Sequence, residues 1–324
     1  MAKISQTIKQ KLFLYTSKKV IDINELRIGK KNSEIAAKEL LKYMELMEKQ
    51  KDIDPLAKVY LSSFAMVAQF SAMLLALPEL KKFTKLMEDF TDLYMPSYPP
   101  MSPITDSHYN IWELVDLKLG LGKDSETMFE IFIALNDVLK IDAFQLGFIK
   151  SISDSYMGLY QVKEIRDGLH LLREIYTGKE IWAKNQSTYV GKVGQYWYAR
   201  VFPAIEGYGH HIVITTPYVL GAITEEGWLA FLNRQKITSD NFLTFMKYGP
   251  DVKFWNEYIT FAYFNHVDLA IFLTGYPDVP NSLPFSDSYE MDEKKQTVML
   301  NSLTNDDLVK LFRNDHFTEH DSRI

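Results

Sequence analysis

The spacing of hydrophobic residues follows a helical period on both sides of a central stretch in which the period changes to two. Before residue 154, apolar residues recur every third or fourth position, which is typical of amphipathic helices. Between Tyr156 and Thr216 apolar and polar residues alternate, and glycine-containing turns separate the runs. The helical period returns after Pro217. The pattern predicts an α+β fold, predominantly helical, with a central small antiparallel β-meander or barrel of about five strands.

Residues that favour helix ends define several of the predicted helices. Asp54 followed by Pro55 is an N-cap with proline at the first helical position, so a helix is expected to begin there. Ser33 is expected to cap an earlier helix, and Asp124 or Ser125 a later one. In the C-terminal part, Asp251 to Leu273 is predicted to form a long helix.

The helix that starts at Pro55 contains an uncharged stretch, Val59 to Leu77, that approaches the length of a membrane span. Polar residues interrupt it at Ser62, Ser63 and Gln69. The neighbouring helices also need an apolar surface to pack against. We therefore predict a buried helix and no membrane span.

The central stretch predicts short strands joined by tight turns such as Asp167-Gly168 and Thr177-Gly178. Local connections between strands of this length favour a small curled sheet or barrel. The predicted strands are Tyr156 to Ile165, Leu169 to Ile175, Glu180 to Ala183, Gln195 to Phe202 and His211 to Thr216.

A chain of 324 residues is long enough for about two domains. The changes of period predict a helical domain over 1–153 and an antiparallel β-module with a trailing helix over 154–236. A helical C-terminal part, 237–324, is expected to pack on the rest, with a frayed tail from about 314. Hydrophobic and charged contents of 47% and 24% are those of an ordinary globular protein.

Composition narrows the classes of function. The chain has no cysteine, which excludes disulfides and thiolate metal sites, and its start lacks a secretory signal, so a cytoplasmic location is expected. The net charge of −6 argues against a dedicated nucleic-acid binder. Residues 1–31 are locally basic, which leaves open a nucleic-acid accessory factor that uses this arm.

Motifs that resemble catalytic or metal sites fail on their chemistry. Gly120 to Asp124 lacks both the first glycine of a phosphate-binding loop, where Leu117 stands, and the hydroxyl that follows its lysine. The string His316 to His320 matches an inverted zinc-protease motif, but only four residues follow it, so no third ligand can come from downstream. No Gly-x-Ser-x-Gly elbow occurs. We expect neither a metal site nor a cofactor.

The predicted strand Gln195 to Phe202 has two chemically different faces. The apolar face is expected to point into the core: Trp197, Ala199 and Val201. The other face, with His210 at the entry to the next strand, is the candidate site for a ligand or partner: Tyr196, Tyr198 and Arg200. Tyrosine and arginine are favoured at recognition surfaces, and they also serve where a sheet docks on helices of the same protein.

The favoured hypothesis is a non-enzymatic protein that binds another protein or a small molecule, of unknown identity, through the Tyr/Arg-rich face of the β-module. The alternative is a hydrolase with a dispersed site around the same sheet. Its histidine would be His210 or His170, and its carboxylate would be Glu174 or Glu180.

Overall fold

The computed structural model of the chain divides into two compact units. Met1–Lys85 and Glu113–Asp154 make up unit 1, and unit 2 takes Leu86–Trp112 and Ser155–Ile324. The change from helices to strands at Asp154 and Ser155 lies beside the predicted boundary, whereas 86–112 joins the β-module. The structure describes residues 3–17, 23–75, 80–94, 106–120, 122–187, 189–220 and 225–248. The predicted helix Asp251 to Leu273 and the tail lie outside these residues.

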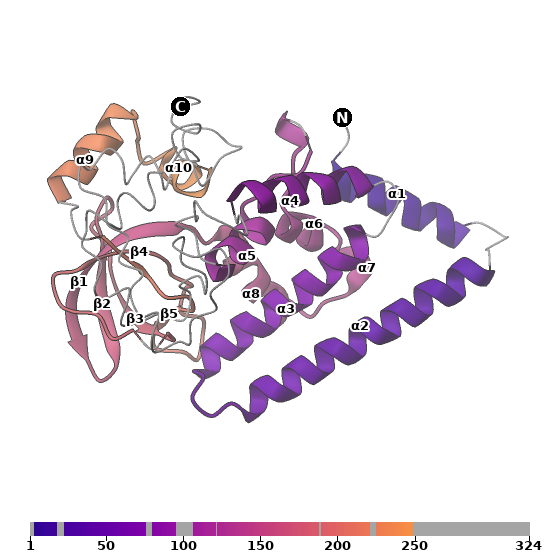
Figure 1. Ribbon diagram of the computed structural model, residues 1–324, viewed down its shortest axis with the longest axis horizontal. Helices are drawn as coiled ribbons and strands as arrows, with labels where there is room; N and C mark the ends of the chain where they lie inside the picture. Colours follow the sequence, from indigo (N-terminus) through magenta and orange to yellow (C-terminus); the bar gives the residue numbers. More distant parts are fainter. Residues whose placement is uncertain are drawn as a thin grey trace, which may run out of the picture. The chain divides into compact units, whose positions relative to one another are not determined.

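Unit 1 is a group of helices around α3, which contacts α2, α6 and α8 (Figure 1). Two further helices, α4 (Lys81–Tyr94) and α5 (Asp106–Val115), contribute residues to both units. The elements of unit 1 are α1 (Ile4–Ser17), α2 (Ile23–Lys49), α3 (Pro55–Leu75), the 3-10 turn η2 (Gly122–Asp124), α6 (Met128–Ala134), α7 (Asn136–Leu139) and α8 (Ala143–Asp154).

Helix α3 begins at Pro55, as predicted, because the Asp54 side chain accepts a hydrogen bond from the Leu56 backbone N–H at 2.9 Å. Its buried residues recur every third or fourth position, and Tyr60 meets Phe148 of α8 edge to face with ring centroids 5.3 Å apart. By length and composition α3 could cross a membrane, a test that the core helix of a helical protein also passes. The absence of a membrane span therefore stays a prediction.

Two of the predicted helix starts are wrong. Ser33 lies inside α2, which begins at Ile23. Helix α6 is capped by Thr127 rather than by Asp124 or Ser125. The Thr127 hydroxyl accepts a hydrogen bond from the Glu130 backbone N–H, and the Thr127 backbone N–H donates to the Glu130 carboxylate. This capping box satisfies two backbone donors, whereas a simple N-cap at Asp124 or Ser125 would satisfy one.

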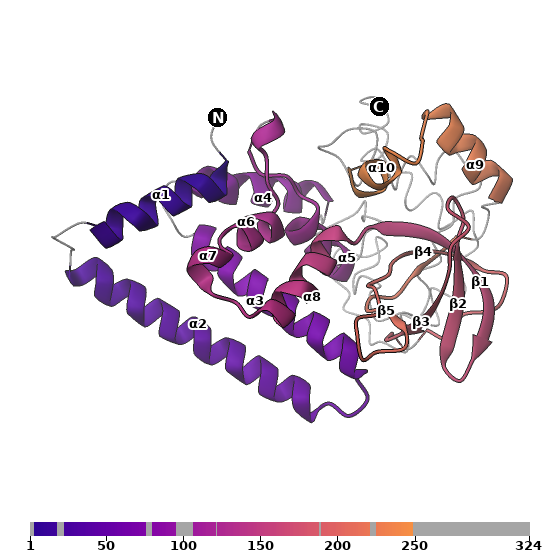
Figure 2. The same ribbon diagram turned by 180° about the vertical axis from the view of Figure 1, so that it is seen from behind.

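Unit 2 contains a closed five-stranded barrel with one extra strand (Figures 1 and 2). The strands pair in the order β5-β3-β2-β1-β4-β6. A bridge between Phe202, just after β4, and Ile212 of β5 closes the barrel and leaves β6 outside it. The predicted fold class is confirmed. The strands are β1 (Met157–Arg166), β2 (Leu169–Glu174), β3 (Glu180–Asn185), β4 (Tyr196–Arg200), β5 (His211–Val213) and β6 (Tyr218–Leu220).

The pairing of β4 with β1 makes the barrel a Greek key rather than a meander. Strands β3 and β5 run parallel, with Ala183 opposite His211, while the other pairs are antiparallel. The order around the barrel is 1-2-3-5-4. Fold order alone assigns no function.

The barrel core follows the alternation along the strands. A bulge between Val162 and Glu164 shifts the register of β1, so that Ile165 again faces inward beside His170. The inward residues include Tyr160, Val162, Leu172, Ala183, Trp197, Ala199, Val213 and Val219.

Two helices follow the barrel, α9 (Glu225–Arg234) and α10 (Phe242–Tyr248). Arg173 of β2 forms an ion pair with Glu225 in the first turn of α9, where a carboxylate also complements the helix dipole. Phe242 of α10 stacks on Tyr176 with ring centroids 4.3 Å apart. These contacts attach both helices to the barrel.

Candidate functional site

The two faces of β4 are divided as the sequence predicts. Trp197 and Ala199 belong to the barrel core, and the partly buried Val201 packs against it. Tyr196, Tyr198 and Arg200 are therefore on the outer side of the barrel. Tyr198 and Arg200 are only 3% and 2% exposed, and Tyr196 is partly exposed.

Contacts within unit 2 account for part of this burial. Strand β6 pairs with β4, with Tyr218 opposite Tyr198. The His108 ring of α5 packs on Tyr218 at 4.4 Å between centroids, and its Nε2 atom lies 2.9 Å from the Thr216 carbonyl oxygen.

Arg200 is hydrogen-bonded to Ser155, which lies just before β1. Its guanidinium donates to both the backbone oxygen and the hydroxyl of Ser155, at 2.9 and 3.0 Å. The expectation that Tyr198 and Arg200 lie exposed in a continuous binding surface is therefore wrong, because these side chains pack inside the protein. Of the three residues, only Tyr196 is partly exposed.

The proposed histidine and carboxylate pair of a hydrolase is not assembled on β2. His170 and Glu174 both face the barrel interior, four residues apart, which is about 13 Å along a strand. The His170 Nε2 atom lies 2.6 Å from the Val190 carbonyl oxygen. Glu174 accepts hydrogen bonds from the backbone N–H groups of Tyr176 and Thr177, and burial raises its pKa.

The other two candidates of that hypothesis lie at the start of β3 and in the loop before β5. Glu180 is exposed and shares the outer face of β3 with Trp182. His210 is partly exposed in the loop before β5, while the next residue, His211, pairs with the inward Ala183. Burial and the nearby charge of Lys179 lower the pKa of His211.

The residues that the structure describes contain no group of three potential metal ligands. The expectation of no metal site stays a prediction for the chain as a whole.

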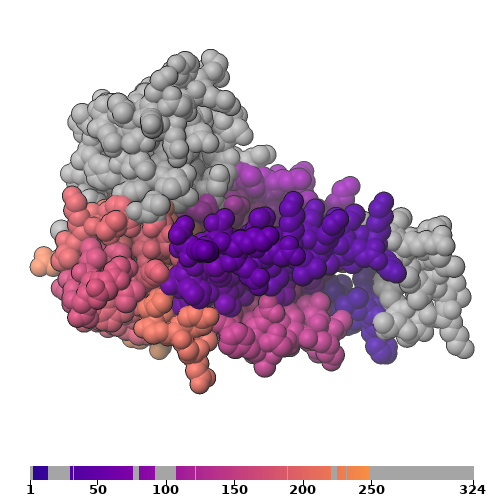
Figure 3. Space-filling model, turned by 90° about the horizontal axis from the view of Figure 1, so that it is seen from below, coloured from indigo at the N-terminus to yellow at the C-terminus, as the bar shows by residue number. Residues whose placement is uncertain are grey.

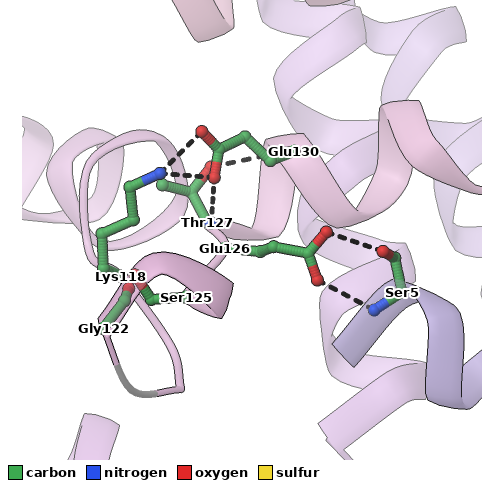
Figure 4. Close-up of polar contacts among 7 residues, drawn as sticks. All are labelled: Ser5, Lys118, Gly122, Ser125, Glu126, Thr127 and Glu130. Atoms are coloured by element: carbon green, nitrogen blue, oxygen red, sulfur yellow. Dashed lines mark hydrogen bonds and ion pairs between the residues drawn. The ribbon is translucent and has the colours of Figure 1, made fainter. Parts of the chain in front are cut away.

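The loop rejected as a phosphate-binding site serves a structural purpose (Figure 4). Leu119 and Glu126 pair as an antiparallel bridge across it. The Lys118 amino group donates to both carboxylate oxygens of Glu130 at 2.6 Å, so this cation is neutralised beside the start of α6. The buried Glu126 carboxylate accepts hydrogen bonds from the Ser5 backbone N–H and hydroxyl, at 2.9 and 2.6 Å, and so fixes the first turn of α1.

The outer face of β1, β2 and β3 carries a group of side chains of which only Glu180 is a candidate predicted from the sequence. The Arg166 guanidinium lies over the partly exposed Trp182 ring, 4.7 Å from its centroid. The register places Leu171 opposite Trp182 and Leu169 opposite Lys184. We call this surface the Trp182 face: Glu164, Arg166, Leu169, Leu171, Glu180, Trp182 and Lys184.

A signal for this surface exists in the sequence. Glu180, Trp182 and Lys184 alternate with Ile181 and Ala183, which predicts one polar face with a tryptophan in its centre. The predicted strand ends at Ala183 and therefore leaves out Lys184, the last residue of this alternation.

Unit 1 has a pocket of about 280 Å³ between the end of α2, the start of α3 and the start of α8. The surface that lines it is largely apolar. The lining residues are Met44, Met47, Glu48, Lys58, Val59, Ser62, Asp142, Phe144 and Gln145.

Comparison with known proteins gives no further assignment. No protein-family model, curated protein or solved structure matches the chain. The function is therefore argued from the residues of the two units.

Proposed function

We propose that this chain binds another protein through the Trp182 face of the barrel. The observation that carries the proposal is the stacking of Arg166 on the partly exposed Trp182. Tryptophan and arginine are enriched among the residues that contribute most to protein–protein affinity. Tryptophan buries a large area, and the planar guanidinium of arginine both donates several hydrogen bonds and stacks on aromatic rings.

The surroundings of Trp182 have the composition of a protein interface. Leu169 and Leu171, both partly exposed, extend the apolar centre on β2. Charged residues of both signs surround it, including Arg166, whose side chain is 63% exposed, and Glu164 beside it. An apolar centre with a mixed charged rim favours a protein partner over a polyanion.

The proposal keeps one residue of the original Tyr/Arg hypothesis. Tyr196 lies at the margin of the Trp182 face, where its hydroxyl is 3.4 Å from the Gln161 amide nitrogen, and Gln161 is opposite Arg173 of β2. We assign Tyr196 to the rim of the binding surface. His210, in the loop before β5, is a further rim candidate.

The test compares captured proteins between variants of the full chain. Wild-type protein, Trp182→Ala and the control Phe13→Ala are each used as bait in a native cytoplasmic extract, with captured proteins quantified by mass spectrometry. Phe13 is an exposed aromatic residue of α1, in unit 1. The proposal predicts at least one partner that Trp182→Ala loses by about tenfold or more and that Phe13→Ala retains. Capture that is equal with all three baits overturns it.

A second candidate function, binding of single-stranded nucleic acid, is favoured by the Greek-key strand order together with the Arg166 and Trp182 stack. Aromatic rings and guanidinium groups on such barrels stack with bases. Fluorescence anisotropy with a labelled oligonucleotide tests it. Affinity that falls steeply with salt and is lost in Trp182→Ala supports this candidate, and absence of binding at low salt excludes it.

A further inference from the structure

We infer that the protein forms a two-fold symmetric dimer in which α2 packs antiparallel against α2 of a second copy. Helix α2 contacts α3 through one side, on which Ala36 is buried and Tyr43 partly buried. The adjoining flank of α2 exposes Leu41 by 61% and Met44 by 36%. In the view from below, the violet atoms of α2 and α3 face the viewer (Figure 3).

The residues of this flank have the spacing of a coiled-coil seam. Steps of four and three residues alternate along it, so the six side chains fall in one stripe. Between Lys30 and Glu48 the stripe is about 27 Å long at 1.5 Å per residue. Its members are Lys30, Glu34, Ala37, Leu41, Met44 and Glu48.

Charge selects the direction in which a second α2 can pack. In antiparallel coiled coils the a position of one helix faces the d position of the other. Lys30 then faces Glu48 of the second copy at each end of the seam, and Leu41 faces Ala37 in the middle. Between them Glu34 faces Met44, and Glu34 also pairs with Lys30 of its own helix at 3.8 Å. A parallel arrangement would instead place Lys30 against Lys30 and Glu48 against Glu48, which repel one another. The charged ends of the stripe are therefore complementary only in the antiparallel direction.

The apolar surface beside this flank favours it over the other exposed flank of α2. Phe144, at the start of α8, is 63% exposed and lines a pocket with Met44 and Met47. A second α2 on the Leu41 flank adjoins this pocket at both ends of the seam. The opposite flank, with Ile35 and Leu46, is also exposed and serves as an internal control.

Sedimentation velocity of the full chain, up to millimolar protein, tests the dimer. Wild type is expected to show a concentration-dependent dimer, and Leu41→Glu should raise its dissociation constant by about tenfold or more, since it places a carboxylate in the centre of the seam. Leu46→Glu, an equal change on the other flank, should leave the dissociation constant unchanged. A monomer at every concentration overturns the inference, as does a dimer that responds to Leu46→Glu and not to Leu41→Glu.

A charge-reversal cycle tests the antiparallel register. Lys30→Glu and Glu48→Lys should each weaken the dimer, because each brings like charges together at both ends of the seam. The double variant restores opposite charges and should return the dissociation constant to within about twofold of wild type. Rescue of the single variants by the double variant is not expected from a folding defect. Single variants without effect, or a double variant that remains weakened, overturn the antiparallel pairing.

Discussion

Gly191 lies directly against the indole ring of Trp197. A Cβ atom at Gly191 would stand 2.3 Å from Cζ2 of that ring, and the backbone at Gly191 has a φ of +72°. Two hydrogen bonds hold the same loop. One joins the Val190 carbonyl oxygen to the His170 ring, and in the other the Tyr189 hydroxyl donates to the Gln195 side chain at 2.7 Å. The loop between β3 and β4 is thus an integral part of the barrel core.

Gly191→Ala is expected to destabilise the barrel strongly. The left-handed backbone costs about 1 kcal/mol for a non-glycine residue, and the overlap with Trp197 adds about 1–3 kcal/mol. Urea denaturation followed by tryptophan fluorescence measures the sum. Gly178→Ala is the control, since Gly178 has a φ of +68° but open space around it. An equal loss in the two variants would show that contact with Trp197 is unimportant.

Glu126→Ala is expected to lower the free energy of unfolding of unit 1 by about 2–3 kcal/mol, because the variant loses two hydrogen bonds to a buried carboxylate. Ser5→Ala removes only the shorter of them and should cost less. Hydrogen exchange should show faster exchange at the start of α1 in both variants. Glu45→Ala, at an exposed position on α2, is the control and should leave that exchange rate unchanged.

His108→Ala is expected to cost about 2 kcal/mol, because it removes a buried hydrogen-bonding group opposite the Thr216 carbonyl and a ring that packs on Tyr218. Asn110→Ala changes an exposed residue on the same helix and should have little effect. Thermal unfolding gives both values. If the two variants unfold at the same temperature, α5 contributes little to covering the outer face of β4 and β6.

Stability should fall with acid through His211. Burial holds its folded pKa below the unfolded value of about 6.5, so as the pH falls through that value the unfolded chain binds a proton before the folded chain does. The contribution of His211 to stability is fully present above the unfolded pKa and is lost at lower pH. Unfolding free energies measured between about pH 5 and 7.5 should decline less steeply for His211→Gln than for wild type. Identical slopes would contradict this assignment.

The local pattern of residues was sufficient to predict which side chains of a strand share a face and where some of the elements begin. Alternation placed Trp197 and Ala199 inward, and Asp54 followed by Pro55 placed the start of α3. The parallel pairing of Ala183 with His211 could not be read in this way, because it joins strands that are not neighbours in the chain.

The candidate site was predicted less well than the fold. Tyr198 and Arg200 have the composition of a recognition surface, but their burial depends on β6 and on Ser155, which alternation within β4 does not report. The contact between Ser5 and Glu126 spans 121 residues and has no local signal. Trp182 could have been recognised as an outward residue, because its neighbours Glu180 and Lys184 are charged.

Unit 2 consists of two separate stretches of the chain, so the ribosome makes its parts at different times. His108 is 108 residues ahead of its acceptor, Thr216, so at roughly 5–20 residues per second it leaves the ribosome roughly 5–20 s before that acceptor is made. During this interval the α5 segment of the nascent chain lacks the β6 partner that buries His108. We expect this segment to stay accessible to chaperones on the emerging chain until β6 has been made.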